Sequence, residues 1–156
     1  MRTAVLTVSD RVSRGTVPDT SGDALAELLA GDGYDVERRV VPDEPDQITG
    51  ALRELTATAA LVLTTGGTGV APRDVTPEAT LAVIEREVPG IAEAMRAASR
   101  PHTKHWMLSR AVAGIRGSTL IVNFPGSPRS IEQTAAAIGA ALPHALALIA
   151  GRPSEH

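Results

Sequence analysis

The sequence predicts an α/β fold of three layers, α/β/α, built around a mainly parallel sheet. Two features of the pattern predict it. Short, nearly continuous apolar runs recur along the chain, which is typical of strands covered on both faces. Each run is followed by a segment with apolar residues at helical spacing, so strands and helices alternate. A length of 156 residues fits one domain, which we expect to span residues 1–156.

Three of the four expected strands are apolar almost throughout and should be buried on both faces. The second is more mixed, because it carries Glu37, Arg38 and Arg39, and we expect it nearer an edge of the sheet. The four segments are residues 3–8, 35–41, 60–64 and 119–124.

The segments between the strands predict helices from apolar stripes and from end signals. Leu25, Leu28 and Leu29 form one such stripe. Thr76 is the expected N-cap of another helix, with Pro77 as its first residue. Residues 99–110 show no clear period and receive no assignment. The expected helices cover residues 21–30, 45–58, 76–87, 90–98 and 130–142, with a last helix or a kink from Pro143 to residue 150.

Composition excludes several classes of function. The net charge is −3 with both signs scattered along the chain, so we expect no nucleic-acid partner. The absence of cysteine excludes disulfides, thiolate metal sites and cysteine nucleophiles. The apolar stretch near the N-terminus is too short for a signal peptide, and no segment reaches the roughly 20 apolar residues that span a bilayer. We therefore expect a cytoplasmic protein with no membrane partner.

The segment 64–80, TTGGTGVAPRDVTPEAT, carries the strongest functional signal. Its glycine loop (residues 66–74) follows a buried strand, precedes a helix start and holds Gly66, Gly67 and Gly69. Glycines allow positive φ and close approach of backbone N–H groups to an anion, so this arrangement predicts a phosphate cradle. Asp74 at its lip suits a Mg²⁺ that bridges to phosphate oxygens. The loop lacks the P-loop lysine and the dinucleotide spacing, and a plain tight turn with Asp74 as a local cap is the alternative.

Polar or glycine-rich clusters follow all four strands. Because the carboxyl ends of parallel strands meet at one edge of the sheet, where ligands bind in open α/β folds, we expect Asp10, Asp43 and Asp74 around one crevice. Each cluster also has a structural alternative. Asp43 can cap the next helix, Asp10 can brace its own loop, Ser127 can cap the last helix, and Asn123 can pin a turn. The clusters are Ser9-Asp10-Arg11, Pro42-Asp43-Glu44, the glycine loop, and residues 123–128.

These clusters, together with Leu108-Ser109-Arg110, resemble the MogA/MoaB family of molybdenum cofactor biosynthesis. The resemblance covers nearly the whole chain, and the motif with Arg73-Asp74 and Thr76-Pro77-Glu78 is specific to that family. It implies a three-layer α/β/α fold, usually assembled as a trimer or hexamer. It also implies molybdopterin adenylyltransferase activity, in which ATP and molybdopterin give adenylylated molybdopterin and pyrophosphate with Mg²⁺.

The resemblance also implies roles for individual residues and partners. Asp43 and Asp74 match the essential acidic residues and are the expected metal ligands. The expected partners are molybdopterin, ATP, further copies of the chain in a homotrimer, and the molybdate-insertion protein. A non-catalytic molybdopterin-binding or carrier protein of the same pathway is the alternative. The residues implied to bind pterin or nucleotide are Ser9, Asp10, Ser13, Thr65, Gly66, Gly67, Thr68, Gly69, Glu78, Ser109, Arg110, Asn123, Pro125, Gly126 and Ser127.

The chemistry of adenylyl transfer fits these residues. The nucleophile is the substrate's own phosphate, so no protein nucleophile or Ser-His-Asp arrangement is needed, and the sequence shows none. Catalysis then rests on positioning and on neutralising charge at the α-phosphate. Arg73, Arg110 and Arg129 are candidates for contacts with phosphate oxygens. His102 and His105 lack a nearby carboxylate and are not expected to hold a metal.

Overall fold

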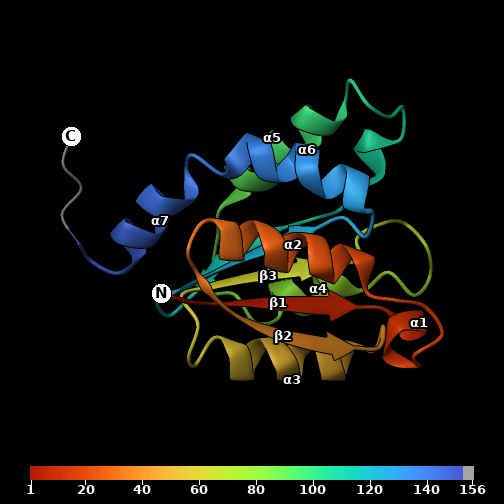
Figure 1. The fold of residues 1–156 in the computed structure, drawn as a ribbon, viewed down its shortest axis with the longest axis horizontal. Coiled ribbons are helices and arrows are strands. Elements are labelled where there is room, and N and C mark those ends of the chain that lie inside the picture. Colours follow the sequence, from red (N-terminus) through yellow and green to blue (C-terminus); the bar gives the residue numbers. More distant parts are fainter. Residues whose placement is uncertain (153–156) are drawn as a thin grey trace.

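The computed structural model describes residues 1–152. Its strands are β1 (Arg2–Val8), β2 (Asp35–Val41), β3 (Leu61–Thr65), β4 (Arg86–Glu87), β5 (Ala113–Arg116) and β6 (Thr119–Phe124). They form one sheet in the order β2-β1-β3-β6-β5-β4 (Figure 1). The first four strands of this order run parallel, whereas β5 and β4 pair antiparallel at one end. The expected mainly parallel sheet is confirmed, and the mixed strand, β2, lies at an edge as predicted.

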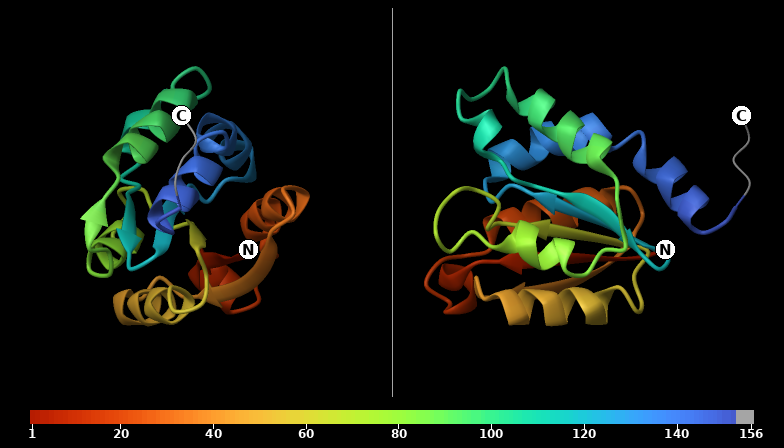
Figure 2. Two further views of the ribbon diagram at one scale, coloured as in Figure 1. Left: turned by 90° about the vertical axis from the view of Figure 1, so that its left-hand side faces the viewer. Right: turned by 180° about the vertical axis from the view of Figure 1, so that it is seen from behind.

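Helices cover both faces of this sheet and complete the three predicted layers (Figure 2). One face carries α3 and α4, and the other carries α2, α5 and α6, while α7 extends beyond the sheet (Figure 1). The helices are α1 (Asp10–Ser13), α2 (Thr20–Gly31), α3 (Pro45–Leu55), α4 (Thr76–Leu81), α5 (Pro89–Ser99), the 3-10 turn η1 (Trp106–Leu108), α6 (Pro128–Ile138) and α7 (Leu142–Ile149). Within residues 1–152, none of these helices has the length and apolar character needed to cross a bilayer.

Alternate residues of the central strands serve the two faces. Leu6 of β1 packs in a cluster with Ile48 and Leu52 of α3, whereas its neighbour Val5 packs in a cluster with Leu25 of α2. All five of these side chains are fully buried, and the removal of each from water contributes roughly 1.5–3 kcal/mol to the stability of the fold. This packing fixes the strand ends, and therefore the loops that leave them.

The expected helix over residues 76–87 is wrong beyond its first turns. The helix α4 ends at Leu81, and Arg86–Glu87 form β4 against β5. The backbone N–H of Glu85 donates to the carbonyl of Ile115, at 2.8 Å, so pairing with the sheet replaces helical hydrogen bonds. The strand β5 itself was not predicted, because AGIR is too short and too mixed to stand out as a run.

Other boundaries differ by a few residues. The helix expected over residues 45–58 ends at Leu55, and the helix expected over residues 130–142 covers Pro128–Ile138. A last helix begins at Leu142 with Pro143 in its first turn, so of the two expectations for this segment, a helix or a kink, the helix is confirmed. The loop after β1 contains the short helix α1, and the unassigned residues 99–110 contain η1. Residues 153–156 of the expected domain lie outside the described residues.

Candidate functional site

A polar cleft lies at the carboxyl ends of the parallel strands, where the chain leaves β1, β2, β3 and β6. Its volume is about 470 Å³, and residues from all four loops line it. The structure therefore brings the four predicted clusters together at one edge, with Asp43 and Asp74 facing the same space. The lining includes Ser9, Asp43, Gly66, Gly67, Asp74 and Gly126. It also includes Arg11, which follows Asp10 in the sequence and to which the sequence analysis assigned no separate role.

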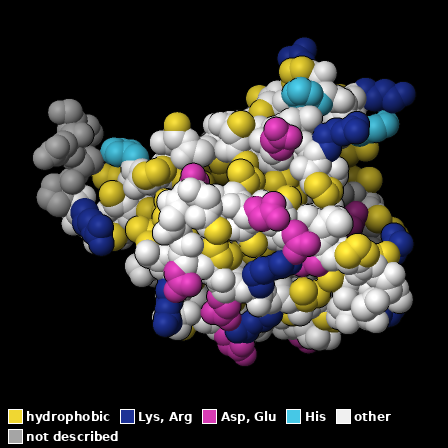
Figure 3. All heavy atoms as spheres, viewed as in Figure 1, with side chains coloured by type: hydrophobic (Ala, Val, Ile, Leu, Met, Phe, Trp, Pro, Cys, Tyr) yellow, Lys and Arg dark blue, Asp and Glu magenta, His cyan; other side chains and the backbone are white. Residues whose placement is uncertain are grey.

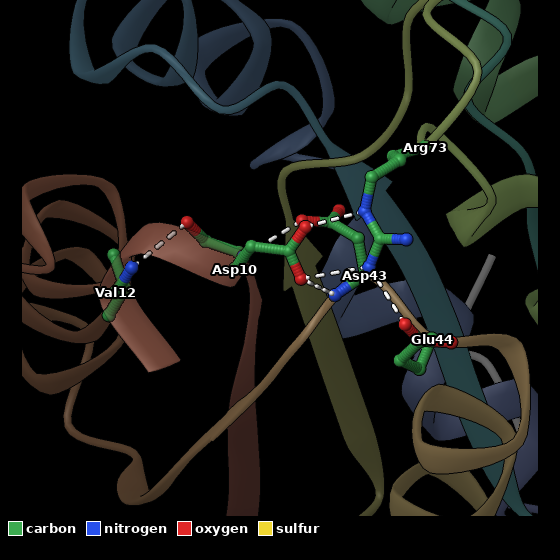
Figure 4. A network of polar contacts seen from close by, with 6 residues as sticks. Asp10, Val12, Asp43, Glu44 and Arg73 are labelled. Atoms are coloured by element: carbon green, nitrogen blue, oxygen red, sulfur yellow. Dashed lines mark hydrogen bonds and ion pairs between the residues drawn. The ribbon is translucent and has the colours of Figure 1, made fainter. Parts of the chain in front are cut away.

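Two aspartates tie the end of β1 to the end of β2 (Figure 4). The N–H of Asp10 donates to Oδ2 of Asp43 at 2.8 Å, and the N–H of Asp43 donates to Oδ1 of Asp10 at 3.1 Å. The alternative that Asp43 caps the next helix is wrong, because Glu44 holds the N-cap position of α3 and makes no side-chain capping bond. The reciprocal pair fixes the Asp43 carboxylate through one oxygen.

Arg73 links the glycine loop to this pair (Figure 4). Its Nε donates to Oδ2 of Asp10 at 2.6 Å, and its Nη2 donates to Oε1 of Glu44 at 2.8 Å. The guanidinium is thus engaged by carboxylates, and its contact with a phosphate oxygen stays a prediction.

The two aspartates have pKa values shifted in opposite directions. The hydrogen bond from Arg73 lowers the pKa of Asp10, so Asp10 is held as a carboxylate. Burial raises the pKa of Asp43, and repulsion from Asp10 and Asp74 adds to that rise against the hydrogen bond from the Asp10 backbone. Of these two aspartates, Asp43 is therefore the one whose charged form a nearby cation would stabilise more.

The glycine loop turns where two of its glycines have positive φ, 95° at Gly66 and 65° at Gly67. Gly69 does not have a positive φ, but a Cβ there would lie 2.8 Å from Oδ2 of Asp74. The hydroxyl of Thr76 donates to the carbonyl of Gly66 at 2.9 Å and so closes the loop. Thr76 was predicted to be the N-cap of α4, but Val75 holds that position. Within residues 1–152, the N–H groups of Gly67, Thr68 and Gly69 have no protein acceptor.

Arg110 holds the same loop from the side of β5. Its Nε donates to the carbonyl of Gly69 at 2.7 Å, and its Nη2 donates to the carbonyl of Asp74 at 2.6 Å. Its Nη1 pairs with Glu78, and this hydrogen bond lowers the pKa of Glu78. The predicted ligand-binding residues Arg110 and Glu78 thus lie beside the site. Arg110 forms hydrogen bonds with Glu78 and with the loop.

Asn123 is the clearest departure from the predicted binding set. It is fully buried, and its amide nitrogen donates to the hydroxyls of Thr64 and Thr80 at 2.9 and 3.0 Å. Its carbonyl oxygen accepts from the N–H of Val112 at 3.2 Å. The side chain is therefore enclosed in the fold and is not among the residues that line the cleft, and its role in binding stays a prediction.

The remaining predicted residues occupy several positions. Ser9 is the N-cap of α1 and accepts from the N–H of Val12, whereas Ser13 is exposed on α1 and does not line the cleft. The hydroxyl of Thr65 donates to the carbonyl of Pro125 at 2.7 Å and joins the end of β3 to the turn before α6. Ser127 takes the predicted N-cap position of α6, but its side chain makes no capping bond.

A second, smaller hollow of about 130 Å³ adjoins the cleft. Two predicted residues, Ser109 and Pro125, line it together with residues of the segment that the sequence left unassigned. The sequence signal that could have pointed to this part of the segment is Trp106, the single tryptophan of the chain. The lining includes Met95, Arg96, Ser99, Trp106, Ser130 and Thr134.

Comparison with known proteins identifies the family. A family model described as a probable molybdopterin binding domain matches residues 4–144. The chain belongs to this family. Molybdopterin adenylyltransferase from Helicobacter pylori is 41% identical over 152 residues, which is 94% of this chain and 86% of that protein. Gephyrin from Dictyostelium discoideum is 41% identical over 97% of this chain, but the chain spans only 23% of its length.

A solved structure supports the same conclusion. The crystal structure of the molybdopterin biosynthesis enzyme MoaB from Thermus thermophilus superposes with a TM-score of 0.90 at 48% identity and covers 99% of both chains. The resemblance to the MogA/MoaB family is thereby confirmed, and so is the three-layer fold that it implied.

The cleft of this chain contains residues that are suited to bind Mg²⁺. Asp43 and Asp74 each use one carboxylate oxygen within the protein, toward the N–H groups of Asp10 and Ala71. Within residues 1–152 their Oδ1 atoms have no hydrogen-bond partner, and no cluster of three or more His, Asp and Glu side chains is placed to hold a metal. Mg²⁺ is usually bound through one or two carboxylates, with phosphate and water completing the shell. Two free carboxylate oxygens beside an anion loop meet that requirement.

Proposed function

We propose that the chain is a molybdopterin adenylyltransferase, which transfers the adenylyl group of ATP to the terminal phosphate of molybdopterin with Mg²⁺. One observation carries the proposal: among the described residues, Asp43 and Asp74 line the cleft and each have a carboxylate oxygen without a hydrogen-bond partner, and the N–H groups of the glycine loop have no acceptor there. Carboxylates for a metal and amides for phosphate oxygens are what phosphoryl-type transfer requires. The similarity to proteins named molybdopterin adenylyltransferase supports the same reaction.

The reaction needs no group on the protein to form a bond. An oxygen of the molybdopterin phosphate attacks the α-phosphorus of ATP, and a new P–O bond forms. The bond between the α-phosphorus and the bridging oxygen breaks, and pyrophosphate leaves with that electron pair. When bound, Mg²⁺ neutralises charge on the phosphates, and Asp43 and Asp74 would hold it.

The chain's own contribution is position. The reciprocal pair of Asp10 and Asp43 sets one carboxylate, and the clamp of Arg110 on Gly69 and Asp74 sets the other end of the loop. The N–H groups of Gly67 and Gly69 then donate to charge that develops on phosphate oxygens, without reorganisation.

The test is release of pyrophosphate from ATP, Mg²⁺ and molybdopterin by the purified protein. We expect turnover that depends on both substrates and on the metal. Binding of molybdopterin by calorimetry without pyrophosphate release would instead assign the carrier role, and failure of both ATP and molybdopterin to bind would overturn both assignments.

We further propose that the chain works as a homotrimer and passes its adenylylated product to the molybdate-insertion protein. Exposed apolar side chains support assembly: Leu28 of α2 is 41% exposed and Leu148 of α7 is 51% exposed. An apolar hollow of about 240 Å³ lies between α2 and α6. Light scattering at micromolar concentration should give three times the chain mass of 16.2 kDa, and the mass of one chain would contradict the assembly.

A further inference from the structure

The hollow around Trp106 lies outside the metal and phosphate chemistry described above. The indole is half-buried on η1 and lines the hollow with Met95 of α5 and Thr134 of α6. The guanidinium of Arg100 lies 5.8 Å from the centre of the ring, a distance at which a cation–π contact holds an aromatic side chain in place. The hollow thus has one broad aromatic wall, beside which a guanidinium lies.

The hollow and the polar cleft are lined by adjacent residues of the chain at one place. Pro125 lines the hollow, and the next residue, Gly126, lines the cleft. Ser109 lines the hollow, and the next residue, Arg110, clamps the glycine loop. The two spaces are therefore neighbours at the turn before α6.

Charge at this end of the molecule favours an anionic ligand. Residues 94–110 contain no Asp or Glu, yet they carry four Lys and Arg residues, although the whole chain is acidic. In Figure 3, basic and His side chains gather over the segment that follows α5, at the upper right. A positive surface beside the cleft attracts ligands that bear phosphate.

We propose that this hollow receives the planar nitrogen heterocycle of a phosphate-bearing substrate, with Trp106 stacked against it and the phosphates in the glycine-loop cleft. This inference rests on the proposed function, since that function supplies two such ligands, ATP and molybdopterin. The size agrees: a whole ligand needs roughly 300 Å³ or more, whereas this hollow of about 130 Å³ holds one ring system. Stacking on an aromatic side chain suits adenine and pterin alike, because both have a π-face.

Trp106 is also the direct reporter, because it is the only tryptophan in the chain. Its emission is followed while AMP, molybdopterin or inorganic pyrophosphate is added to the full-length protein, with binding of each verified by calorimetry. We expect the ring-bearing ligand to quench the emission, and pyrophosphate, which has no ring, to leave it unchanged. Quenching by AMP alone assigns the adenine, quenching by molybdopterin alone assigns the pterin, and mutual displacement assigns a ring site that both share. An equal change with pyrophosphate, or no change while AMP and molybdopterin bind, overturns the inference.

Variants separate this inference from the proposed function. Trp106→Ala should raise the KM of the ligand whose ring stacks there on the order of tenfold, with little change in kcat, and Trp106→Phe should restore most of it. Met107→Ala is the matched control, since its side chain lies on the same turn, is 62% exposed and does not line the hollow. Wild-type KM values for both substrates in folded Trp106→Ala overturn the ring site and leave the transferase assignment standing. If the wild-type protein lacks turnover, the proposed function fails, and the emission titration still decides whether the hollow takes a ring.

Discussion

Arg73 and Arg110 both fix the glycine loop, but they use different partners. Arg73 belongs to the loop and reaches out to the carboxylates of Asp10 and Glu44. Arg110 stands outside the loop and donates to the main-chain carbonyls of Gly69 and Asp74. The Arg73 side chain is 55% exposed and that of Arg110 is 37% exposed. Water therefore screens the Arg73 contacts more strongly, and the two clamps should differ in strength.

The difference separates residues that hold the site in place from carboxylates that stay available to a cation. On the Arg73 side, Asp10 is neutralised by the guanidinium, and this leaves Asp43 as the less compensated carboxylate with the raised pKa. On the other side, Arg110 takes the carbonyl of Asp74 and leaves its Oδ1 free within residues 1–152. In both places the arginine forms hydrogen bonds within the protein, and a neighbouring carboxylate stays available to a cation.

The largest effect is expected from removing either available carboxylate. Asp43→Asn and Asp74→Asn should each lower pyrophosphate release on the order of 100-fold or more, because a neutral amide cannot hold Mg²⁺ as a carboxylate does. Asp43→Asn keeps an oxygen acceptor for the N–H of Asp10, so circular dichroism should show an intact fold. Asp46→Asn, an exposed residue of α3, is the control and should retain activity. Near-normal turnover in a folded Asp74→Asn protein would refute its role.

The two clamps themselves provide the next test. Arg110→Ala should cost about 2 kcal/mol of unfolding free energy, since it leaves charge-assisted hydrogen bonds to two carbonyls unmade. Arg73→Ala should cost clearly less than Arg110→Ala, because exposed ion pairs contribute little. Urea unfolding of both variants measures the difference. Equal losses, or a larger loss for Arg73→Ala, would show that exposure does not rank these clamps.

The third prediction concerns Gly67, where strain and contact act together. Gly67→Ala places a Cβ 2.4 Å from the Thr76 hydroxyl and 3.1 Å from Oδ1 of Asp43, whereas Gly15 has a similar φ, 74° against 65°, with no atom within 4 Å. Gly15→Ala should therefore cost about 1 kcal/mol from positive φ alone, and Gly67→Ala should cost more. Only Gly67→Ala should weaken binding of ATP and molybdopterin beyond its loss of stability, as calorimetry can show. Unchanged affinity for both ligands in folded Gly67→Ala would leave the loop as scaffold only.

How much of this could be predicted from the sequence depends on how local each signal is. The four parallel strands and the loop with Gly66 and Gly67 were predictable, because apolar runs and glycine spacing are properties of adjacent residues. The strands β4 and β5 were not, since two to four mixed residues become strands only when a neighbouring edge offers hydrogen bonds. The convergence of Asp10, Asp43 and Asp74 followed from the parallel sheet rule rather than from any one motif.

The roles within the site were harder to predict than its location. Asn123 looks like a ligand-binding residue in sequence, and only the approach of Thr64 and Thr80 in the fold shows that its amide is already satisfied. Arg73 and Arg110 look like phosphate-binding residues for the same reason. The sequence does not show which carboxylates and carbonyls surround an arginine, because these groups come from distant parts of the chain and meet it only in the fold.

The smallest effect, and the one that compares the two linked aspartates directly, is the pH dependence of stability without metal. Asp10 has a pKa below its ordinary value of 3.8, so its carboxylate adds stability above that pH, and this is lost as pH falls through the lowered value. Asp43 has a pKa above 3.8, so its carboxylate costs stability increasingly as pH rises from 3.8 through the raised value, and the cost persists at pH 7.

The two substitutions should therefore act in opposite directions at pH 7 in the presence of a chelator. Asp10→Asn should lower the urea midpoint and Asp43→Asn should raise it, while each amide keeps an oxygen for the partner's N–H. Below the ordinary value of 3.8 the gain from Asp43→Asn should disappear, because the wild-type carboxyl is then protonated. The loss from Asp10→Asn should fade at still lower pH, once its lowered pKa is passed. Shifts in the same direction at pH 7 would mean that Arg73 does not divide the two aspartates into a holding carboxylate and an available one.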